Sequence, residues 1–181
     1  MKIITQTPRL IIREFNLDDA QAVYDFNAPE VVNLYTGDAG RCESIEDAKN
    51  IITEIWLKEY QTIGFGRWAV VLKETGHIIG FCGFKQDSLI NEVDIGYRFH
   101  PDYWGKSIAT EANLACIEYA KKHMALDYVV GDAMRDNQAS INVLRKLGMT
   151  FVKQVHIDDW LLDRYAISLK SEAVGMSSAQ Q

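Results

Sequence analysis

The segment EVDIGYRFHPDYWGKSIATEA, residues 92–112, constrains the fold more than any other part of the chain. Apolar and polar side chains alternate from residue 92 to residue 100, which predicts a β-strand with one face in the core and one polar face. The core face carries Val93, Ile95, Tyr97 and Phe99, and the polar face carries Glu92, Asp94, Gly96, Arg98 and His100. A glycine-containing loop and apolar residues at helical spacing follow at once. A strand, a loop and a helix N-terminus therefore come in direct succession.

The loop places Gly105, Lys106 and Ser107 immediately before the predicted helix. The first turn of a helix has unpaired backbone N–H groups and the positive end of the helix dipole, so it can bind a phosphate group. A single glycine at a helix start is, by itself, more often only a turn. A P-loop requires GxxxxGK[ST] and a dinucleotide fold requires GxGxxG, and this segment has neither. The spacing therefore disfavours ATP and NAD as ligands.

The other segments predict an α+β fold around this centre. Further strands are expected at residues 9–15, 66–72, 77–84, 127–134, 150–157 and 163–170, with turns at 74–76 and 88–91. Helices are expected from Asn16 or Asp18 to Pro29, from Ser44 to about Tyr60, from Gly105 to His123, and from Asn137 to Leu147. This order predicts a mostly antiparallel sheet of about seven strands with about four helices, and a parallel crossover between residues 92 and 157.

The composition limits the classes of protein that the chain can represent. With 181 residues, of which 48% are hydrophobic, the chain suits one domain, expected over residues 1–170, with a polar, flexible tail at 171–181. The net charge of −6 argues against nucleic acid as a partner, because such binding depends on Lys and Arg. No stretch resembles a signal peptide or approaches ~18 apolar residues, so we expect no membrane partner and a cytoplasmic location.

The cysteines and histidines predict neither a disulfide framework nor a metal site. Cys42, Cys82 and Cys116 are odd in number and widely spaced, without a CxxC pair. The histidines have no ligand partners at metal spacing. No metal is therefore expected.

Three segments together resemble one family: TPRLIIREFNLDDA at 7–20, YRFHPDYWGKSIATEA at 97–112 and DNQASINVLRKLGM at 136–149. The chain resembles the GNAT N-acetyltransferase superfamily, specifically the branch with the ribosomal-protein N-terminal acetyltransferases RimJ and RimL, to about Lys170. The resemblance implies a sheet splayed by a bulge in the strand before the loop, with acetyl-CoA in the gap. It also implies cofactor-binding residues: Tyr97, Arg98 and Phe99 beside the pantetheine arm, Gly105, Lys106, Ser107, Ile108 and Ala109 around the pyrophosphate, and Asn137 and Ser140 near the thioester.

The chain departs from the family pattern at three positions. The loop signature begins with Arg or Gln and ends with Gly or Ala, whereas this chain has Asp102 and Ser107 there. We expect Ser107 to weaken cofactor binding without abolishing it. Many members present a Tyr on the second motif helix as general acid, and Leu144 stands at that position. Ser140 is the nearest hydroxyl and is the expected substitute, although it can equally serve the helix backbone, and water can also act.

Acetyl transfer to an amine is helped by a base, because amines with pKa values near ~10 are mostly protonated at neutral pH. Asp94 is the first candidate, since the branch often carries a carboxylate two residues before the GY of this strand and Gly96 leaves room beside the backbone. Glu92 on the same face could act through water. Both carboxylates can instead be solvated or pair with Arg98, and His100 is a weaker candidate.

The acceptor is the least determined part of the reaction. The branch favours a protein N-terminal α-amine, attacked directly in a ternary complex, but a small-molecule amine or a non-catalytic CoA-binding sensor is also open. Four aromatic residues can line an acceptor cleft or lie in the core: Tyr35, Trp56, Trp68 and Trp160. The chain is expected to be a monomer or a homodimer.

Overall fold

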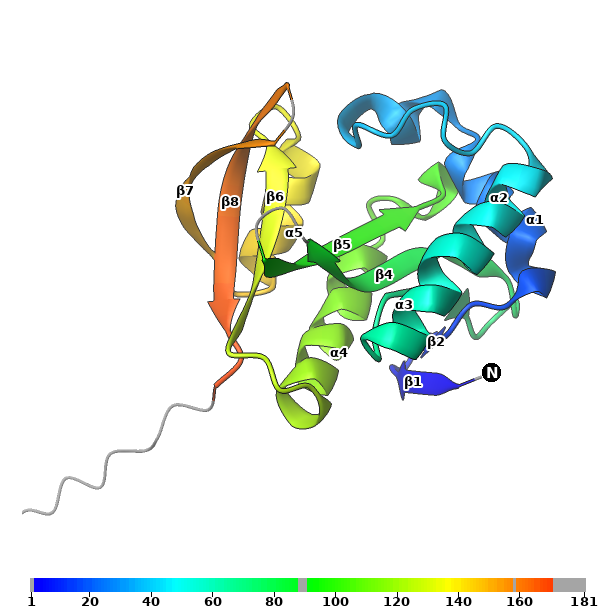
Figure 1. The fold of residues 1–181 in the computed structure, drawn as a ribbon, viewed down its shortest axis with the longest axis horizontal. Helices are drawn as coiled ribbons and strands as arrows, with labels where there is room; N and C mark the ends of the chain where they lie inside the picture. The colour runs from blue at the N-terminus through cyan, green and yellow to red at the C-terminus, as the bar shows by residue number, and fades with distance from the viewer. Residues whose placement is uncertain (1, 88–90, 158, 171–181) are drawn as a thin grey trace, which may run out of the picture.

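Eight strands form one mixed sheet in the computed structural model, which describes residues 2–87, 91–157 and 159–170 (Figure 1). The strands are β1 (Ile3–Gln6), β2 (Leu10–Arg13), β3 (Arg67–Leu72), β4 (Ile78–Asp87), β5 (Glu92–Phe99), β6 (Tyr128–Met134), β7 (Thr150–Ile157) and β8 (Trp160–Ser168). Their order is β1-β2-β3-β4-β5-β6-β8-β7, and every pair is antiparallel except β5 with β6. The predicted α+β class and the parallel crossover are confirmed.

The α-helices are α1 (Ala20–Asn27), α2 (Ile45–Ile51), α3 (Leu57–Thr62), α4 (Ile108–His123) and α5 (Gln138–Lys146). A π-helical turn at Ile52–Trp56 joins α2 to α3, so the helix predicted from Ser44 is interrupted rather than uniform. Ser44 caps α2 as predicted, accepting a hydrogen bond from the Asp47 N–H. Short 3₁₀ turns occur at Leu17–Asp19, Glu30–Tyr35 and Pro101–Tyr103.

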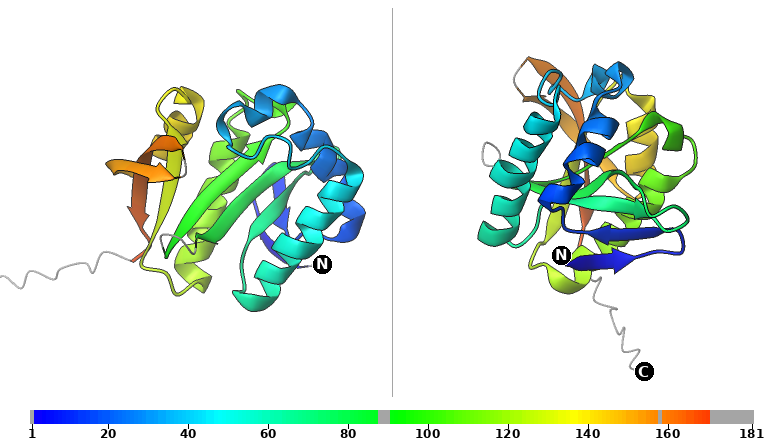
Figure 2. Two further views of the ribbon diagram at one scale, coloured as in Figure 1. Left: turned by 45° about the horizontal axis from the view of Figure 1, so that its top comes forward. Right: turned by 90° about the vertical axis from the view of Figure 1, so that its right-hand side faces the viewer.

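The helices cover both faces of the sheet (Figure 2). On one face, α1 and the α2–α3 segment pack against β3 and β4 through a cluster of Phe15, Ala20, Val23, Phe26, Ala48, Ile52, Trp56 and Ala69, with Phe81 beside it. On the other face, α4 buries Ile108, Ala112, Cys116, Ile117 and Ala120 against Trp68, Val70, Cys82 and their neighbours. The sheet is therefore covered around its centre, where β5 carries the alternating segment.

The sheet opens between β5 and β6. These two strands share one register pair, Asp94 with Val130, whereas β4 pairs with β5 over the whole of β5 and β6 pairs with β8 along its full length. The β4–β5 register contains no shift, so the bulge expected to open the sheet is not found there. Because each half-sheet keeps its own pairing and twist, β5 and β6 separate beyond their single contact.

The predicted alternation along β5 is confirmed. Val93, Ile95 and Phe99 are buried in the core beneath α4, while Asp94 and Arg98 form ion pairs on the other face. The predicted tail at 171–181 and most of the turn at 88–91 lie outside the described residues. Within the described part of the chain, no helix is long and apolar enough to cross a membrane.

Candidate active site

Two cavities meet at the opening of the sheet. The larger, of about 740 Å³, lies among β5, β6 and the α2–α3 segment. The smaller, of about 460 Å³, lies among the end of β5, the loop before α4, and α5. We call the residues that line both cavities the junction: Tyr35, Thr36, Tyr97, Arg98, Asn137 and Ser140. A molecule in one cavity can therefore touch a molecule in the other at the C-terminal half of β5 and the start of α5.

The smaller cavity contains the glycine loop. Gly105 and Ser107 both adopt left-handed backbone conformations, with φ of 72° and 59°, and α4 begins at Ile108 rather than at Gly105. A Cβ added at Gly105 would meet no atom within 4 Å, so the backbone there faces open space. Gly105, Ser107, Ile108 and Ala109 line this cavity. The loop thus offers the unpaired N–H groups of the first helical turn to a bound anion.

The N-terminal segment holds this loop in place. The Arg9 side chain donates to Glu111 Oε2 at 2.6 Å and to the Lys106 carbonyl at 3.0 Å. Thr7 Oγ1 also donates to Glu111. Partial burial raises the pKa of the Glu111 carboxyl, but the bonds from Thr7 and Arg9 outweigh this effect and lower it overall. Arg9 and Glu111 therefore tie β1–β2 to the first turn of α4.

Arg67 occupies the polar face of β5 beside Asp94. Its guanidinium pairs with Asp94 Oδ2 at 2.6 Å and donates to the Gly83 carbonyl at 2.6 Å. A Cβ at Gly96 would overlap the Arg67 guanidinium. The missing side chain of Gly96 therefore makes room for Arg67, and not for a ligand as the sequence suggested.

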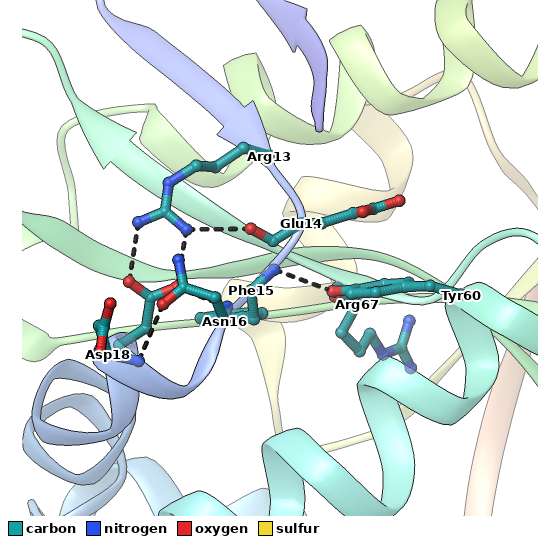
Figure 3. Close-up of polar contacts among 8 residues, drawn as sticks. Arg13, Glu14, Phe15, Asn16, Asp18, Tyr60 and Arg67 are labelled. Carbon is teal, nitrogen blue, oxygen red and sulfur yellow. Dashed lines mark hydrogen bonds and ion pairs between the residues drawn. The ribbon is translucent and has the colours of Figure 1, made fainter. Parts of the chain in front are cut away.

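The electrostatic setting of Asp94 contains opposing influences. Burial raises the pKa of its carboxyl, and the charge and hydrogen bond of Arg67 oppose that rise. Tyr60 helps to hold Arg67, because its hydroxyl donates to the Arg67 carbonyl and accepts from the Phe15 N–H at 3.3 Å (Figure 3). Asp94 itself lines the larger cavity.

Arg98 forms no ion pair with Asp94 or Glu92, the two candidate bases. It pairs with Asp38 at 2.8 Å and also donates to Asn27. Arg67 and Arg98 flank the Phe81 ring, with guanidinium carbons 5.9 and 5.7 Å from its centre. Both arginines line the larger cavity.

Glu92 and His100 lie away from both cavity linings. Glu92 forms an ion pair with Arg164 and accepts from the Tyr128 hydroxyl at 3.1 Å. Arg164 also holds Asp132 at 2.6 Å. The His100 side chain accepts from the Asp102 N–H, capping the Pro101–Tyr103 turn. These contacts give both residues structural partners.

Ser140 stands at the junction with Tyr97. Their hydroxyl oxygens are 2.8 Å apart, and the Tyr97 hydroxyl also lies 3.1 Å from the Ser140 carbonyl. Asn137 caps α5 by accepting from the Ser140 N–H at 3.1 Å. Leu144, one turn further along α5, is 1% exposed and lines the larger cavity.

A sequence profile described as "Acetyltransferase (GNAT) domain" matches residues 9–150. The chain belongs to the GNAT acetyltransferase family. "Uncharacterized N-acetyltransferase YnaD" of Bacillus subtilis (strain 168) is 32% identical over 143 residues, which are 79% of this chain and 80% of that protein. As a GNAT enzyme, the chain is an acetyl-CoA-dependent N-acetyltransferase.

Solved structures share the GNAT fold along almost the whole chain. A GNAT-family acetyltransferase from Bacillus anthracis is 26% identical with a TM-score of 0.78, covering 93% of this chain and 99% of the other. RimL, a ribosomal alpha-N-protein acetyltransferase in complex with coenzyme A, has a TM-score of 0.79 at 16% identity, covering 92% and 98%. At that identity the likeness to RimL concerns the fold alone.

The smaller cavity fits the acetyl-CoA that a GNAT enzyme uses. Its loop backbone faces open space at Gly105, and it is lined by nine of the ten predicted cofactor residues: Tyr97, Arg98, Phe99, Gly105, Ser107, Ile108, Ala109, Asn137 and Ser140. Lys106 is outside that lining. Its ammonium lies over the Tyr103 ring, 5.5 Å from the centre, and its carbonyl accepts from Arg9.

The structure also places residues in the GNAT site that the sequence patterns did not reveal. Arg67 was visible only as a residue of the strand expected at 66–72. Glu59 lies on α3 and lines the larger cavity. Its Oε2 is buried with no hydrogen-bond partner among the described residues. Burial raises the pKa of that carboxyl, against the nearby charges of Arg67 and Lys85. Arg67 reaches the site from β3 and Glu59 from α3, and no local sequence spacing signals such contacts.

The four candidate aromatic residues divide between cleft and core. Tyr35, Trp56 and Trp160 line the larger cavity, whereas Trp68 is 1% exposed and packs in the core. Over the residues the structure describes, no three His, Cys, Asp or Glu side chains are grouped as metal ligands.

Proposed function

We propose that this GNAT enzyme holds acetyl-CoA in the smaller cavity and acetylates a primary amine that enters the larger cavity, by direct attack in a ternary complex. The observation that carries this proposal is the junction, where Tyr97 and Ser140 line both cavities. Two substrates that meet there can react without a covalent enzyme intermediate. Holding both in contact removes much of the entropic barrier to reaction.

When bound, acetyl-CoA supplies an acetyl group already activated as a thioester. The backbone N–H groups at residues 105–109 would bind its pyrophosphate, because they belong to the loop before α4 and to the open first turn of that helix. The edge of β5 at Tyr97, Arg98 and Phe99 is free of β6, so its backbone can pair with the pantetheine arm. Asn137 and Ser140 would lie near the thioester end.

Asp94 is proposed as the base that takes a proton from the acceptor amine. Its Oδ2 is bound to Arg67, and the residue lines the larger cavity. The charge and hydrogen bond of Arg67 oppose the rise in pKa that burial causes at this carboxyl, and they fix its orientation. Glu59 is the alternative base, since it lines the same cavity with an unpartnered oxygen. Glu92 is less well placed, because Arg164 and Tyr128 hold it.

A protein N-terminal α-amine is the proposed acceptor, in keeping with the RimJ and RimL branch that the motifs resemble. A cavity of about 740 Å³ also falls within the range of small-molecule sites, ~300–1,000 Å³, so a small amine is the second candidate. A CoA-binding sensor is the third, favoured by the Arg67 side chain beside Asp94.

An acceptor screen separates these possibilities. Peptides with free N-termini, N-terminally blocked peptides carrying lysine, polyamines and amino acids are incubated with the enzyme and acetyl-CoA, and products are identified by mass spectrometry. We expect acetylation of free peptide N-termini but not of the blocked peptides. Acetylation confined to small amines would move the acceptor to the second class. CoA binding without any acetylated product would instead support the sensor.

The cofactor site is tested by Gly105→Val with Gly76→Val as a matched control. Both glycines have positive φ, 72° and 73°, and at both an added Cβ would meet no atom within 4 Å. Each variant should therefore lose about 1–3 kcal/mol of stability through backbone strain. Only Gly105→Val should also lose affinity for acetyl-CoA, measured by calorimetry. Equal affinity in the two variants would exclude the loop as the pyrophosphate site.

A further inference from the structure

The Tyr97 hydroxyl is a feature of the junction that the mechanism above does not use. Tyr97 and Asp94 point to opposite faces of β5, because their positions differ by an odd number of residues. Tyr97 packs against the core beneath α4 and reaches α5, where its hydroxyl is 2.8 Å from Ser140 Oγ. The proposed base and this hydroxyl pair therefore lie on opposite sides of the strand edge where the two substrates would meet.

Counting protons shows what the hydroxyl pair can do. Each hydroxyl has one O–H donor and can accept, so one proton is shared between the two oxygens and one is left over. If Tyr97 donates to Ser140 Oγ, the Ser140 O–H is free to point into the junction. If Ser140 donates to Tyr97, the Tyr97 proton can bind the Ser140 carbonyl 3.1 Å away. A ligand that accepts a hydrogen bond favours the first arrangement.

Many GNAT members have a tyrosine on the second motif helix, but this chain has no hydroxyl at that position. Leu144 stands at that position and fills the space over Gly131, where an added Cβ would lie 2.7 Å from Leu144 Cδ2. Leu144 thus supplies an apolar wall and no donor. Within the junction, the hydroxyl donors on β5 and α5 are Tyr97 and Ser140. Both Ser140 and its capping residue Asn137 stand at the start of α5, where the helix dipole favours negative charge.

We propose that Tyr97 is a positioning residue that directs the Ser140 O–H toward the departing sulfur of CoA. This inference rests on the proposed function. As the carbon–nitrogen bond forms, the carbon–sulfur bond breaks and its electron pair stays on sulfur. The Ser140 O–H stabilises that thiolate by a charge-assisted hydrogen bond. The nitrogen loses a proton to Asp94, which returns it to water, and the sulfur takes one from water, so the protons balance.

The surroundings keep the Tyr97 hydroxyl a neutral donor. The pKa of Tyr97 is raised to about 12, mainly because the side chain is buried. The hydrogen bond with Ser140 lowers this pKa and the charge of Asp94 raises it. Three further charged groups line the two cavities on these elements: Arg98 pairs with Asp38, Asp132 pairs with Arg164, and Lys146 lines the smaller cavity on α5. Tyr97 therefore stays protonated over the pH range of an assay.

Binding of CoA and of desulfo-CoA, which lacks the sulfur, tests this role without any acceptor. Both affinities are measured by calorimetry at about pH 7 and about pH 9.5, a range that includes the pKa of ~8.5 of an ordinary cysteine thiol. In the wild type, the ratio of CoA to desulfo-CoA affinity should rise several-fold with pH, toward a limit of about tenfold, as expected when the bound thiol pKa falls by about one unit. The sulfur-free ligand removes every effect of pH that does not involve the thiolate.

The variants are Tyr97→Phe and Ser140→Ala, with Tyr119→Phe as the control. Tyr119 packs against Trp68 in the core, outside both cavity linings. Both junction variants should lose most of the pH-dependent rise, and the double variant should lose no more than Ser140→Ala alone, because coupled residues are not additive. Tyr119→Phe should retain the rise.

The inference is overturned if Tyr97→Phe keeps the wild-type ratio at both pH values. This holds whether both affinities are unchanged or CoA and desulfo-CoA are weakened equally, since equal weakening is the mark of a purely structural residue. A wild type that binds neither ligand would contradict the proposed function instead, so the two failures are distinguishable.

Discussion

At the scale of single residues, Ser107 shows why its position in the loop suits glycine. Its φ of 59° lies in the left-handed region, where an L-residue is strained by contact between Cβ and its own backbone. The resemblance indicated Gly or Ala there, and the backbone supplies the reason. The sequence could show the departure, but only the structure shows that the departure strains the chain.

Replacing Ser107 by Gly should therefore stabilise the protein. Relief of left-handed strain contributes roughly 1–2 kcal/mol, and the greater freedom of glycine in the unfolded chain removes roughly 0.4–1. We expect a net gain of about 0.5–1 kcal/mol in urea unfolding, with acetyl-CoA affinity unchanged or higher. A loss of stability would show that the Ser107 side chain contributes more than its strained backbone costs.

Asp94 is the residue whose role depends most on pH. If it deprotonates the amine, Asp94→Asn should lower kcat/KM by about 100-fold or more near neutral pH, with little change in CoA affinity. The deficit should shrink toward about pH 9–10, where acceptor amines lose their proton in solution. Glu59→Gln and Glu92→Gln are measured beside it, once the screen has given an acceptor. A pH-independent deficit, or a larger loss in Glu59→Gln, would remove Asp94 from the role.

At the scale of elements, the sequence predicted the parts that local patterns control. The strand at β5 and the helix expected from Asn137 to Leu147 follow from alternation and helical spacing, and the structure has both, with Asn137 as the cap of α5. The π-helical turn at Ile52–Trp56 was not predictable, because its wider hydrogen bonding has no residue signature. The short strand β1 was missed. The predicted first strand began at residue 9, which follows the turn between β1 and β2.

Loss of the contact between β1–β2 and α4 should weaken acetyl-CoA binding while leaving the stability of the fold almost unchanged. Arg9→Ala removes the bonds to Glu111 and Lys106, and should reduce acetyl-CoA affinity several-fold by loosening the loop. Because the Arg9 side chain is 44% exposed, the change in unfolding free energy should stay within about 1 kcal/mol. Arg135→Ala, an exposed ion-paired arginine on the chain, is the control. Equal CoA affinity in both variants would contradict the contribution of Arg9.

The contribution of this contact to folding stability should depend on pH, because it includes the Glu111 carboxylate. The pKa of Glu111 is lower in the folded protein than its ordinary value, so its contribution to stability is present above the unfolded pKa of ~4.3 and is lost as pH falls below it. Glu111→Gln should therefore flatten the acid limb of the stability curve, measured by urea unfolding between about pH 3 and about pH 6. An unchanged acid limb would show that Glu111 is not held in this way.

At the scale of the whole molecule, the opening of the sheet depends on contacts between distant strands. The chain order predicted a parallel β5–β6 crossover, and the structure has it, but with one register pair. The sequence could not give that extent, since β6 is held by its antiparallel partner β8 as well. For the same reason the sequence placed a ligand space beside Gly96, where Arg67 reaches across from β3.

We propose that acetyl-CoA binds at the open first turn of α4 and the free edge of β5. Amide hydrogen exchange, with and without saturating acetyl-CoA, tests it most directly because it needs no acceptor. We predict that acetyl-CoA slows exchange at residues 105–110 and 97–99, and changes it little along α2 and α3. Equal exchange at residues 105–110 with and without the ligand, or protection confined to α2 and α3, would contradict this binding site.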